Sequence, residues 1–415
     1  MSDFIARAIS ARRDMRALFT ETPLQKNEHL SARYDATILL KREDLSPVRS
    51  YKIRGAFNAM KKSLAAHPDK RHFVCASAGN HAQGVAFVCK HFQTNGVVFM
   101  PVTTPQQKID KTRAFGGDNI EIRLVGDYFD DTLKAAQAFC AQQGAVFLSP
   151  YDDTDVIEGQ ASVAVEMIEQ SPDKVDMVIL PVGGGGLAAG VVTYLKEVSP
   201  KTEIRFVEPM GGASMAAALE QGSPFTLRKV NNFVDGAAVA RLGDKTFAAL
   251  SAIDRAHVLA VSEDRICTTM LELLNVEGIV LEPAGALSVD ALQDLAEEVR
   301  GKTVVCVTSG GNFDFERLPE VKERALKFSG LKKYYILQFP QRPGALREFL
   351  DILGPDDDIT RFEYLKKSAR NFGSVLIGIE AKRPDDFNDI ELRLEEAGMS
   401  FQDITQNDAL SQFLV

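Results

Sequence analysis

The segment Ser50-Tyr51-Lys52-Ile53-Arg54-Gly55-Ala56 places one lysine in a modestly apolar stretch, directly after the polar turn Glu43-Asp44-Leu45-Ser46-Pro47. Most lysines lie on solvated surfaces, so this local sequence alone says little about chemistry. Four further motifs follow Lys52 in order along the chain. They are Ser77-Ala78-Gly79-Asn80-His81, Gly183-Gly184-Gly185-Gly186-Leu187, Glu282-Pro283-Ala284-Gly285 and Ser309-Gly310-Gly311-Asn312. The ordered set predicts more than any single member does.

Composition bounds the class of protein. The chain has 415 residues, 45% of them hydrophobic and 25% charged, which is enough for two or three soluble globular domains. A net charge of −9 without a dense Lys/Arg tract argues against a nucleic-acid partner. The cysteines are scattered without a C-x-x-C pair, which favours a reducing compartment and free thiols. They are Cys75, Cys89, Cys140, Cys267 and Cys306.

The sequence predicts no membrane partner. No apolar run approaches the ~18 residues that a membrane-spanning helix needs. Residues 1–13 carry an acidic side chain early and lack an apolar core, which predicts no signal peptide. We therefore expect a cytoplasmic protein, and the motifs predict no metal site.

Apolar runs of strand length alternate with helical stretches over most of the chain. Strands are expected at residues 36–41, 73–76, 97–100, 120–125, 146–148, 177–182, 204–207, 257–261 and 303–307. Helices are expected at residues 3–18, 55–65, 81–91, 106–115, 128–143 and 156–170. Strands that alternate with helices of this length predict an α/β fold with open, mostly parallel sheets. The alternation does not say how many sheets there are.

A composition shift near Phe328-Ser329-Gly330 indicates a second unit. Beyond it we expect a strand at 334–339, a helix at 345–353, hairpin strands at 359–365 and 375–380 around residues 366–373, a helix at 385–397 and a strand at 401–405. That order, βαββαβ, is typical of a ferredoxin-like domain.

The glycine run from Gly183 to Leu187 follows an expected buried strand and opens a helix that we place from Ala188. Successive glycines let the backbone approach an anion, and their N–H groups add to the positive end of the helix dipole. A phosphate site is one interpretation, and a tight glycine turn is another. No Lys-Ser/Thr pair follows, which excludes a Walker A loop. A dinucleotide fold stays open, because Gly184, Gly186 and Ala189 fit G-x-G-x-x-A with Glu208 about twenty residues on.

The remaining motifs also lie at the ends of expected strands or helices. The loop Ser77 to His81 offers a hydroxyl, an amide and free N–H groups that suit a carboxylate at a helix N-terminus. His81 itself is more typical of a cap or packing residue than of a catalyst. Ser309 lies at a strand-end turn, and Glu282 is an acid at a helix start.

Together and in this order, these motifs resemble the fold type II (tryptophan-synthase-β-like) family of pyridoxal-phosphate enzymes, and within it the threonine dehydratases (threonine ammonia-lyases). The resemblance implies a catalytic domain over residues 1–328, with a smaller subdomain of about 54–150 inserted in the larger one. Lys52 would form the Schiff base with pyridoxal 5'-phosphate and remove the Cα proton of the substrate.

The resemblance also implies roles for the other site residues. The segment Gly183-Gly184-Gly185-Gly186-Leu187 would hold the cofactor phosphate, and Ser77-Ala78-Gly79-Asn80-His81 the substrate carboxylate. Asn80 would bond the ring oxygen of the cofactor, and Glu282 would support the ring. Ser309 would face the pyridine nitrogen, where a hydroxyl, unlike a carboxylate, does not hold a proton, so that elimination competes well with transamination.

The second unit, residues 329–415, resembles an ACT-like amino-acid-sensing domain, with Arg342-Pro343-Gly344-Ala345-Leu346 opening its first helix. There is room for one such unit. Such a domain ends biosynthetic threonine dehydratases, which implies feedback by isoleucine, with valine as a second effector, and a homodimer or homotetramer. A small oligomerisation domain is the alternative interpretation.

The predicted reaction is the conversion of L-threonine, and also L-serine, to a 2-oxo acid and ammonia, with 2-oxobutanoate formed from threonine as the first step of isoleucine biosynthesis. Serine dehydratase and serine racemase are alternatives in the same cofactor class. Racemases carry serine where this chain has Ala78, which argues against racemisation. A nicotinamide-dependent oxidoreductase and a catalytically silent amino-acid sensor are alternatives outside that class.

Overall fold

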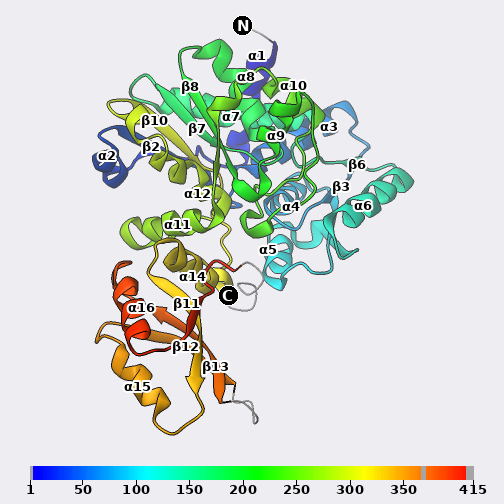
Figure 1. The fold of residues 1–415 in the computed structure, drawn as a ribbon. Helices are drawn as coiled ribbons and strands as arrows, with labels where there is room; N and C mark the ends of the chain where they lie inside the picture. Colours follow the sequence, from blue (N-terminus) through cyan, green and yellow to red (C-terminus); the bar gives the residue numbers. More distant parts are fainter. Residues whose placement is uncertain (1–2, 366–370, 408–415) are drawn as a thin grey trace. The chain divides into compact units, whose positions relative to one another are not determined.

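The computed structural model describes residues 3–365 and 371–407 (Figure 1). The chain forms two compact units, Met1–Asp314 and Phe315–Val415. Among the described residues, no helix has both the length and the apolar character needed to span a membrane.

The first unit contains a six-stranded sheet in the order β1-β2-β10-β7-β8-β9. Its strands are β1 (Leu24–Lys26), β2 (Thr37–Arg42), β10 (Thr303–Thr308), β7 (Met177–Pro181), β8 (Glu203–Pro209) and β9 (Val258–Val261). All neighbours pair in parallel except the edge strand β1, which is antiparallel to β2. The central strand β7 is apolar and buried throughout, as expected for a parallel strand covered on both faces.

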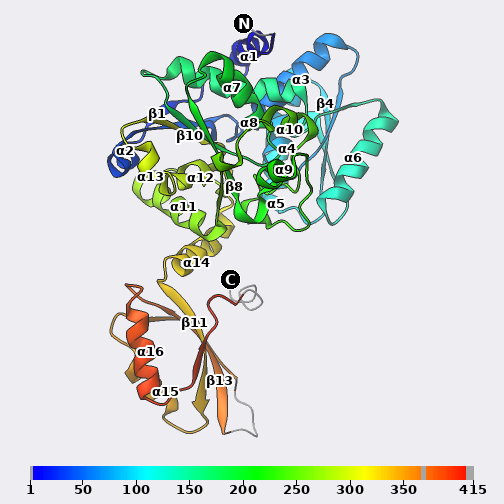
Figure 2. The same cartoon turned by 45° about the horizontal axis from the view of Figure 1, so that its top comes forward.

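Helices cover both faces of this sheet (Figures 1 and 2). One face packs against α1 (Asp3–Asp14), α7 (Thr154–Gln170), α8 (Gly186–Val198), α9 (Ser214–Gln221) and α10 (Asp244–Leu250). The other face carries α11 (Glu263–Glu277) and α12 (Pro283–Asp290), with α2 (Glu28–Tyr34) and α13 (Ala296–Val299) near its β1–β2 edge.

A second, four-stranded sheet of the same unit has the order β5-β4-β3-β6, with all neighbours parallel. Its strands are β3 (His72–Ala76), β4 (Asn95–Met100), β5 (Ile120–Leu124) and β6 (Val146–Phe147). Helices α3 (Lys52–Ala66), α4 (Asn80–Phe92) and α5 (Gln106–Gly116) pack on one face, and α6 (Phe129–Gln143) packs on the other. The predicted α/β class with open, mostly parallel sheets is confirmed.

Helices α3 and α8, which carry site residues, begin earlier than predicted. Helix α3 starts at Lys52 rather than Gly55, because the carbonyl of Tyr51 already accepts a bond from the N–H of Arg54. Helix α8 starts at Gly186 rather than Ala188, so the last glycine of the run is helical. Lys52 therefore lies in the first turn of a helix rather than in a loop before it.

The second unit is antiparallel. It comprises α14 (Leu318–Phe328), β11 (Lys332–Pro340), α15 (Ala345–Ile352), β12 (Asp358–Leu365), β13 (Phe372–Glu380), α16 (Asp386–Glu396) and β14 (Phe401–Asp403). The sheet order β12-β13-β11-β14 is that of a ferredoxin-like fold, as predicted. Residues 366–370 of the predicted hairpin connection lie outside the described part of the chain. Phe349 of α15 and Phe387 of α16 pack with Leu337 of β11 in a core on one face of the sheet.

Candidate active site

Three of the predicted motifs lie at the carboxyl ends of parallel strands. Ser77-Ala78-Gly79 joins β3 to α4, Gly183-Gly184-Gly185 joins β7 to α8, and Ser309 follows β10. This is the edge at which open α/β sheets bind ligands. The motifs come from both sheets of the first unit, so a ligand held by all of them touches both sheets.

Backbone pairing joins the segment before Lys52 to the loop after β10. The N–H of Tyr51 donates to the carbonyl of Ser309 over 3.1 Å, and the N–H of Gly311 donates to the carbonyl of Arg49 over 2.8 Å. An antiparallel bridge between Ser50 and Gly310 lies between these bonds. The first and last motifs of the sequence are therefore adjacent.

Side chains connect the remaining motifs. Asn80 donates from Nδ2 to Oε1 of Glu282 over 2.6 Å, and Lys52 donates from Nζ to the carbonyl of Pro150 over 2.9 Å. The next residue, Tyr151, packs on the glycine loop so closely that a β-carbon built on Gly184 would overlap its ring. All five motifs thus meet in one place, and the role of each residue there stays a prediction.

Lys52 has the properties of a reactive amine. Burial lowers its pKa to about 8, while the negative charge of Glu282 opposes that shift. The amine also lies 5.3 Å from the centre of the Tyr51 ring. At neutral pH a much larger fraction of this amine is uncharged than in an exposed lysine, and only the uncharged amine can act as a nucleophile or a base.

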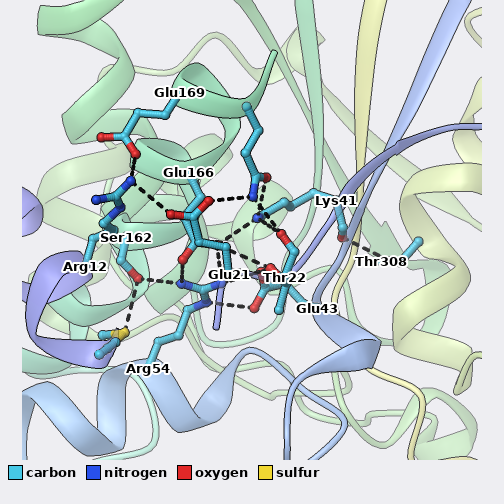
Figure 3. A network of polar contacts seen from close by, with 12 residues as sticks. Arg12, Glu21, Thr22, Lys41, Glu43, Arg54, Ser162, Glu166, Glu169 and Thr308 are labelled. Atoms are coloured by element: carbon cyan, nitrogen blue, oxygen red, sulfur yellow. Dashed lines mark hydrogen bonds and ion pairs between the residues drawn. The ribbon is translucent and has the colours of Figure 1, made fainter. Parts of the chain in front are cut away.

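A buried ion cluster of Arg54, Glu43, Glu166 and Lys41 holds the helix that carries Lys52 (Figure 3). Arg54 donates to Glu43 over 2.7 and 2.8 Å and to Glu166 over 3.0 and 2.7 Å. Glu166 also accepts from Lys41 over 2.7 Å. Burial alone would raise the pKa of Glu166, but the two cations outweigh it and lower that pKa to about 2. The cluster ties α3 to α7 and to β2.

The glycine loop fits an anion. Gly185 has φ +88°, a conformation that favours glycine. Among the described residues, no acceptor receives the N–H groups of Gly184 and Gly185, which precede the first turn of α8. Unpaired N–H groups at a helix N-terminus form a phosphate site. The ring of Tyr151 leaves no room for a side chain at position 184, so this position requires glycine.

The loop before α4 has space for a ligand, whereas its histidine is already bonded. A β-carbon built on Gly79 would meet no atom within 4 Å. The ring of His81 bonds through Nε2 to the carbonyl of Leu148 over 3.0 Å. Burial, with a smaller contribution from the charge of Lys52, lowers the pKa of His81 to about 3. The ring is therefore neutral and donates to that carbonyl, which fits the predicted packing role.

Ser309 and Glu282 are both buried next to α12. Ser309 donates from Oγ to the carbonyl of Ala284 over 3.2 Å. Burial, followed by the charge of Asp235, raises the pKa of Glu282 to about 7, and the bond from Asn80 opposes that rise. Near neutral pH Glu282 is therefore only partly ionised, so the site carries little fixed negative charge.

Two segments that contact the predicted motifs were not predicted from the sequence. The first segment, Pro150 and Tyr151, follows β6. Its cluster of Pro and Asp residues at the end of a parallel strand is typical of a loop at a ligand-binding edge, and could have indicated this segment. The second segment, residues 235–239, places Gly236 beside Glu282 and Ala237 beside Gly183. Asp235 pairs with Lys108 of α5, which links this segment to the small-sheet helices.

Comparison with known proteins agrees with this geometry. The family model described as pyridoxal-phosphate dependent enzyme matches residues 15–310. The model described as the C-terminal regulatory domain of threonine dehydratase matches residues 323–414. The chain belongs to the pyridoxal-phosphate-dependent enzymes of the threonine dehydratase family.

Individual relatives match along nearly the whole chain. The biosynthetic L-threonine dehydratase IlvA of Halalkalibacterium halodurans is 46% identical over 408 residues, which covers 98% of each chain. That of Bacillus subtilis is 47% identical over 408 residues and 98% of this chain, and 96% of its own. The solved structure of the processed threonine deaminase isoform 2 of Solanum lycopersicum is 36% identical, with a TM-score of 0.72, and the match covers 78% of this chain and 94% of that one.

Family membership contradicts the nicotinamide-dependent alternative, and Glu208 gives the physical reason. Glu208 is buried, and its carboxyl oxygens accept from the N–H groups of Met215 over 2.7 Å and Ala216 over 2.9 Å. It therefore stabilises the start of α9 and is not available to bind a ribose hydroxyl.

The residues present fit pyridoxal phosphate. Lys52 supplies an amine of lowered pKa, the glycine loop supplies unpaired N–H groups for a phosphate, and Asn80 supplies an amide N–H beyond the one bonded to Glu282. The open space at Gly79 adds room on the side of α4.

The buried ion cluster gives a first prediction. We expect Arg54→Met to destabilise the protein by about 3–5 kcal/mol, because it leaves Glu43 without its guanidinium partner and Glu166 paired only with Lys41 and, over 3.5 Å, with Arg16. Urea unfolding followed by circular dichroism measures this loss. Arg300→Met removes an exposed ion pair with Glu297 and serves as the control, with an expected change within about 1 kcal/mol. Equal effects of the two substitutions would contradict the role of the cluster.

The lowered pKa of Lys52 gives a second prediction. We expect the apo-protein to take up pyridoxal phosphate faster as the pH rises through about 8, because only the uncharged amine attacks an aldehyde. Absorbance followed over time after mixing measures the rate at each pH. Nα-acetyl-lysine, whose amine keeps a pKa of about 10.4, gives the reference curve. Two coincident pH profiles would show that the site does not alter Lys52.

Proposed function

We propose that the protein converts L-threonine to 2-oxobutanoate and ammonia, as the first step of isoleucine biosynthesis. The observation that carries this proposal is the 46% identity over 98% of the chain to a biosynthetic L-threonine dehydratase. The site supports it with one amine of lowered pKa, a phosphate-binding glycine loop and a neutral hydroxyl at Ser309. L-serine is the second proposed substrate, because it carries the same β-hydroxyl.

Each residue of the site has a separate role in the proposed elimination. Bound pyridoxal phosphate supplies the electron sink for the electron pair left on Cα. Lys52 would hold the cofactor through Nζ, and its freed amine would take the Cα proton of the substrate on the same atom. The loop from Ser77 to His81 would orient the substrate carboxylate. The N–H of Ser77 already donates to the carbonyl of Phe99 and that of Gly79 to Oγ of Ser77, so the remaining N–H groups of the loop would supply the donors. The β-hydroxyl would then leave as water, with a proton equivalent to the one taken from Cα. One water molecule would hydrolyse the resulting enamine to 2-oxobutanoate and ammonia.

The side chain of Ala78 favours elimination over racemisation. Racemisation needs a second acid on the face of Cα opposite Lys52, and Ala78 has no group that can hold a proton. His81 lies next in the same motif, but it is neutral and bonded to Leu148. The remaining hydroxyl of the motif, that of Ser77, accepts a bond from the N–H of Gly79 over 3.2 Å and does not stand at the position where racemases carry their serine.

We also propose that residues 329–415 bind isoleucine and reduce activity, with valine as a second effector, and that the protein forms a homodimer or homotetramer. The ferredoxin-like order of its sheet and the regulatory-domain match over residues 323–414 support this. Control then follows if the effector binds one of two arrangements of the protein more tightly than the other. The catalytic part spans residues 1–328 in this proposal, with residues 54–150 as its smaller subdomain.

A cytoplasmic location is proposed from the cysteines. Cys75, Cys89, Cys140, Cys267 and Cys306 are all free and buried. Burial raises the pKa of Cys75, Cys89 and Cys306, so these thiols stay protonated. Free thiols suit a reducing compartment.

The activity gives a third prediction. The purified protein with pyridoxal phosphate is expected to release 2-oxobutanoate from L-threonine, and Lys52→Ala is expected to release none, because no other amine replaces Nζ. A coupled assay for 2-oxo acids measures both. Lys62→Ala, on the same helix, is the control and should retain activity, because its half-buried amine pairs with Asp155 and Glu158 and not with a site residue. Turnover by Lys52→Ala would remove the central claim.

Feedback gives a fourth prediction. At saturation, L-isoleucine is expected to slow 2-oxobutanoate release from the full chain by about fivefold or more, the range typical of allosteric coupling. D-isoleucine has the same charge and composition and should have no effect. A rate that L-isoleucine leaves unchanged would assign residues 329–415 to assembly or to another effector.

A further inference from the structure

A chain of side-chain amides runs from the backbone before Lys52 to Glu282. Asn312 donates from Nδ2 to the carbonyl of Val48 over 2.8 Å and to Oδ1 of Asn80 over 2.7 Å. Asn80 then donates from Nδ2 to Oε1 of Glu282 over 2.6 Å. These three bonds connect the last predicted motif to the second and the fourth.

The Val48 end of the chain fixes its direction. The carbonyl of Val48 can only accept, so Asn312 must turn its NH₂ group toward it. The second hydrogen of that NH₂ group then points to Asn80, which accepts the bond with Oδ1. The amide of Asn80 is therefore oriented with Nδ2 toward Glu282, whose carboxyl oxygen accepts the bond.

This orientation matters for a ligand. Asn80 uses one N–H on Glu282 and keeps the other, while its oxygen is already bonded to Asn312. Asn80 thus offers a donor, and not an acceptor, to an anionic oxygen such as that on the ring of pyridoxal phosphate. A flipped amide would present its oxygen instead, which repels an anionic oxygen and leaves Glu282 without its donor.

The backbone around Asn312 is also fixed. The preceding residues pair with residues 49–51, and a β-carbon built on Gly311 would lie 2.9 Å from the carbonyl of Val280. Both hydrogens of the Asn312 amide are used within the protein, so its amide has no N–H left for a ligand. Asn312 therefore acts through Asn80.

We propose that Asn312 is a positioning residue, which fixes the amide of Asn80 so that its free N–H faces the cofactor. The proposal rests on the proposed placement of Asn80 beside the cofactor ring, but not on the identity of the substrate. It assigns a task to the last residue of the motif Ser309-Gly310-Gly311-Asn312, for which the sequence predicted none.

The test is a double-mutant cycle with Asn312→Ala, Asn80→Ala and the double variant, read by the dissociation constant and the absorption spectrum of bound pyridoxal phosphate. We expect Asn312→Ala to weaken binding about tenfold or more, as the loss of an orienting partner of a ligand-binding residue typically does. We expect the double variant to bind no more weakly than Asn80→Ala alone, because Asn312 acts only through Asn80. Asn312→Asp, which cannot donate to Val48, should weaken binding at least as much.

Asn119→Ala is the matched control, since Asn119 also donates to a backbone carbonyl, that of Thr94 over 3.1 Å, in the small-sheet part of the unit. It should leave the dissociation constant and the spectrum unchanged. Thermal unfolding of each apo-variant separates lost folding from lost positioning. Unchanged binding by both Asn312 variants, or an equal loss from Asn312→Ala with and without Asn80, would overturn the proposal. Because no substrate is used, a failure of threonine turnover would leave this result intact.

Discussion

The two buried cations and two buried anions around Arg54 are the constraint on which the site depends. An isolated charge in the interior costs several kcal/mol, and each member of this cluster is tolerated only because the others neutralise it. Arg54 is two residues from Lys52 on the same helix, and its partners lie on α7 and directly after β2. The start of α3 therefore cannot move without breaking a set of matched charges. An apolar contact would tolerate sliding, whereas the two bidentate pairings of a guanidinium do not.

Much of the fold could be predicted because it depends on periodicity. The buried run of β7 and the alternating strands and helices after residue 73 can be identified by length and apolar character alone. The sequence did not predict β1, α2, α9, α10 and α13, since short elements carry few periods. It also left the longer helices α11 and α14 unassigned, and of α12 it predicted only the start, at Glu282. The start of α3 is predicted three residues late because no side-chain cap marks it. The carbonyl of Tyr51, a residue that pairs with Ser309, accepts the first bond from the N–H of Arg54.

Some residues of the site could be predicted from the sequence and others could not. Lys52, the glycine run and Ser309 could be proposed because their residue types and order carry a signal. The bond that Pro150 makes could not, because it uses a backbone carbonyl, which every residue has, although the Pro and Asp cluster does mark this strand end. Arg54 in the sequence is one of many charged residues, and only its complete burial against Glu43 and Glu166 shows what it holds. Partners that act through the backbone or through burial leave little trace in a single sequence.

The electrostatics of the site follow from these fixed elements. Burial moves three groups toward their neutral forms: the pKa of Lys52 falls to about 8, that of Glu282 rises to about 7 and that of His81 falls to about 3. Ser309 adds a hydroxyl and no charge. A site close to neutral lets the charge on a bound ligand interact mainly with oriented N–H groups, those of the glycine loop and of Asn80. Such dipoles are held in place by the backbone and by Asn312, so they require little reorganisation when charge develops on the substrate. Elimination, which needs one mobile proton on one amine, is the chemistry that this arrangement favours over reactions that need a charged acid on each face.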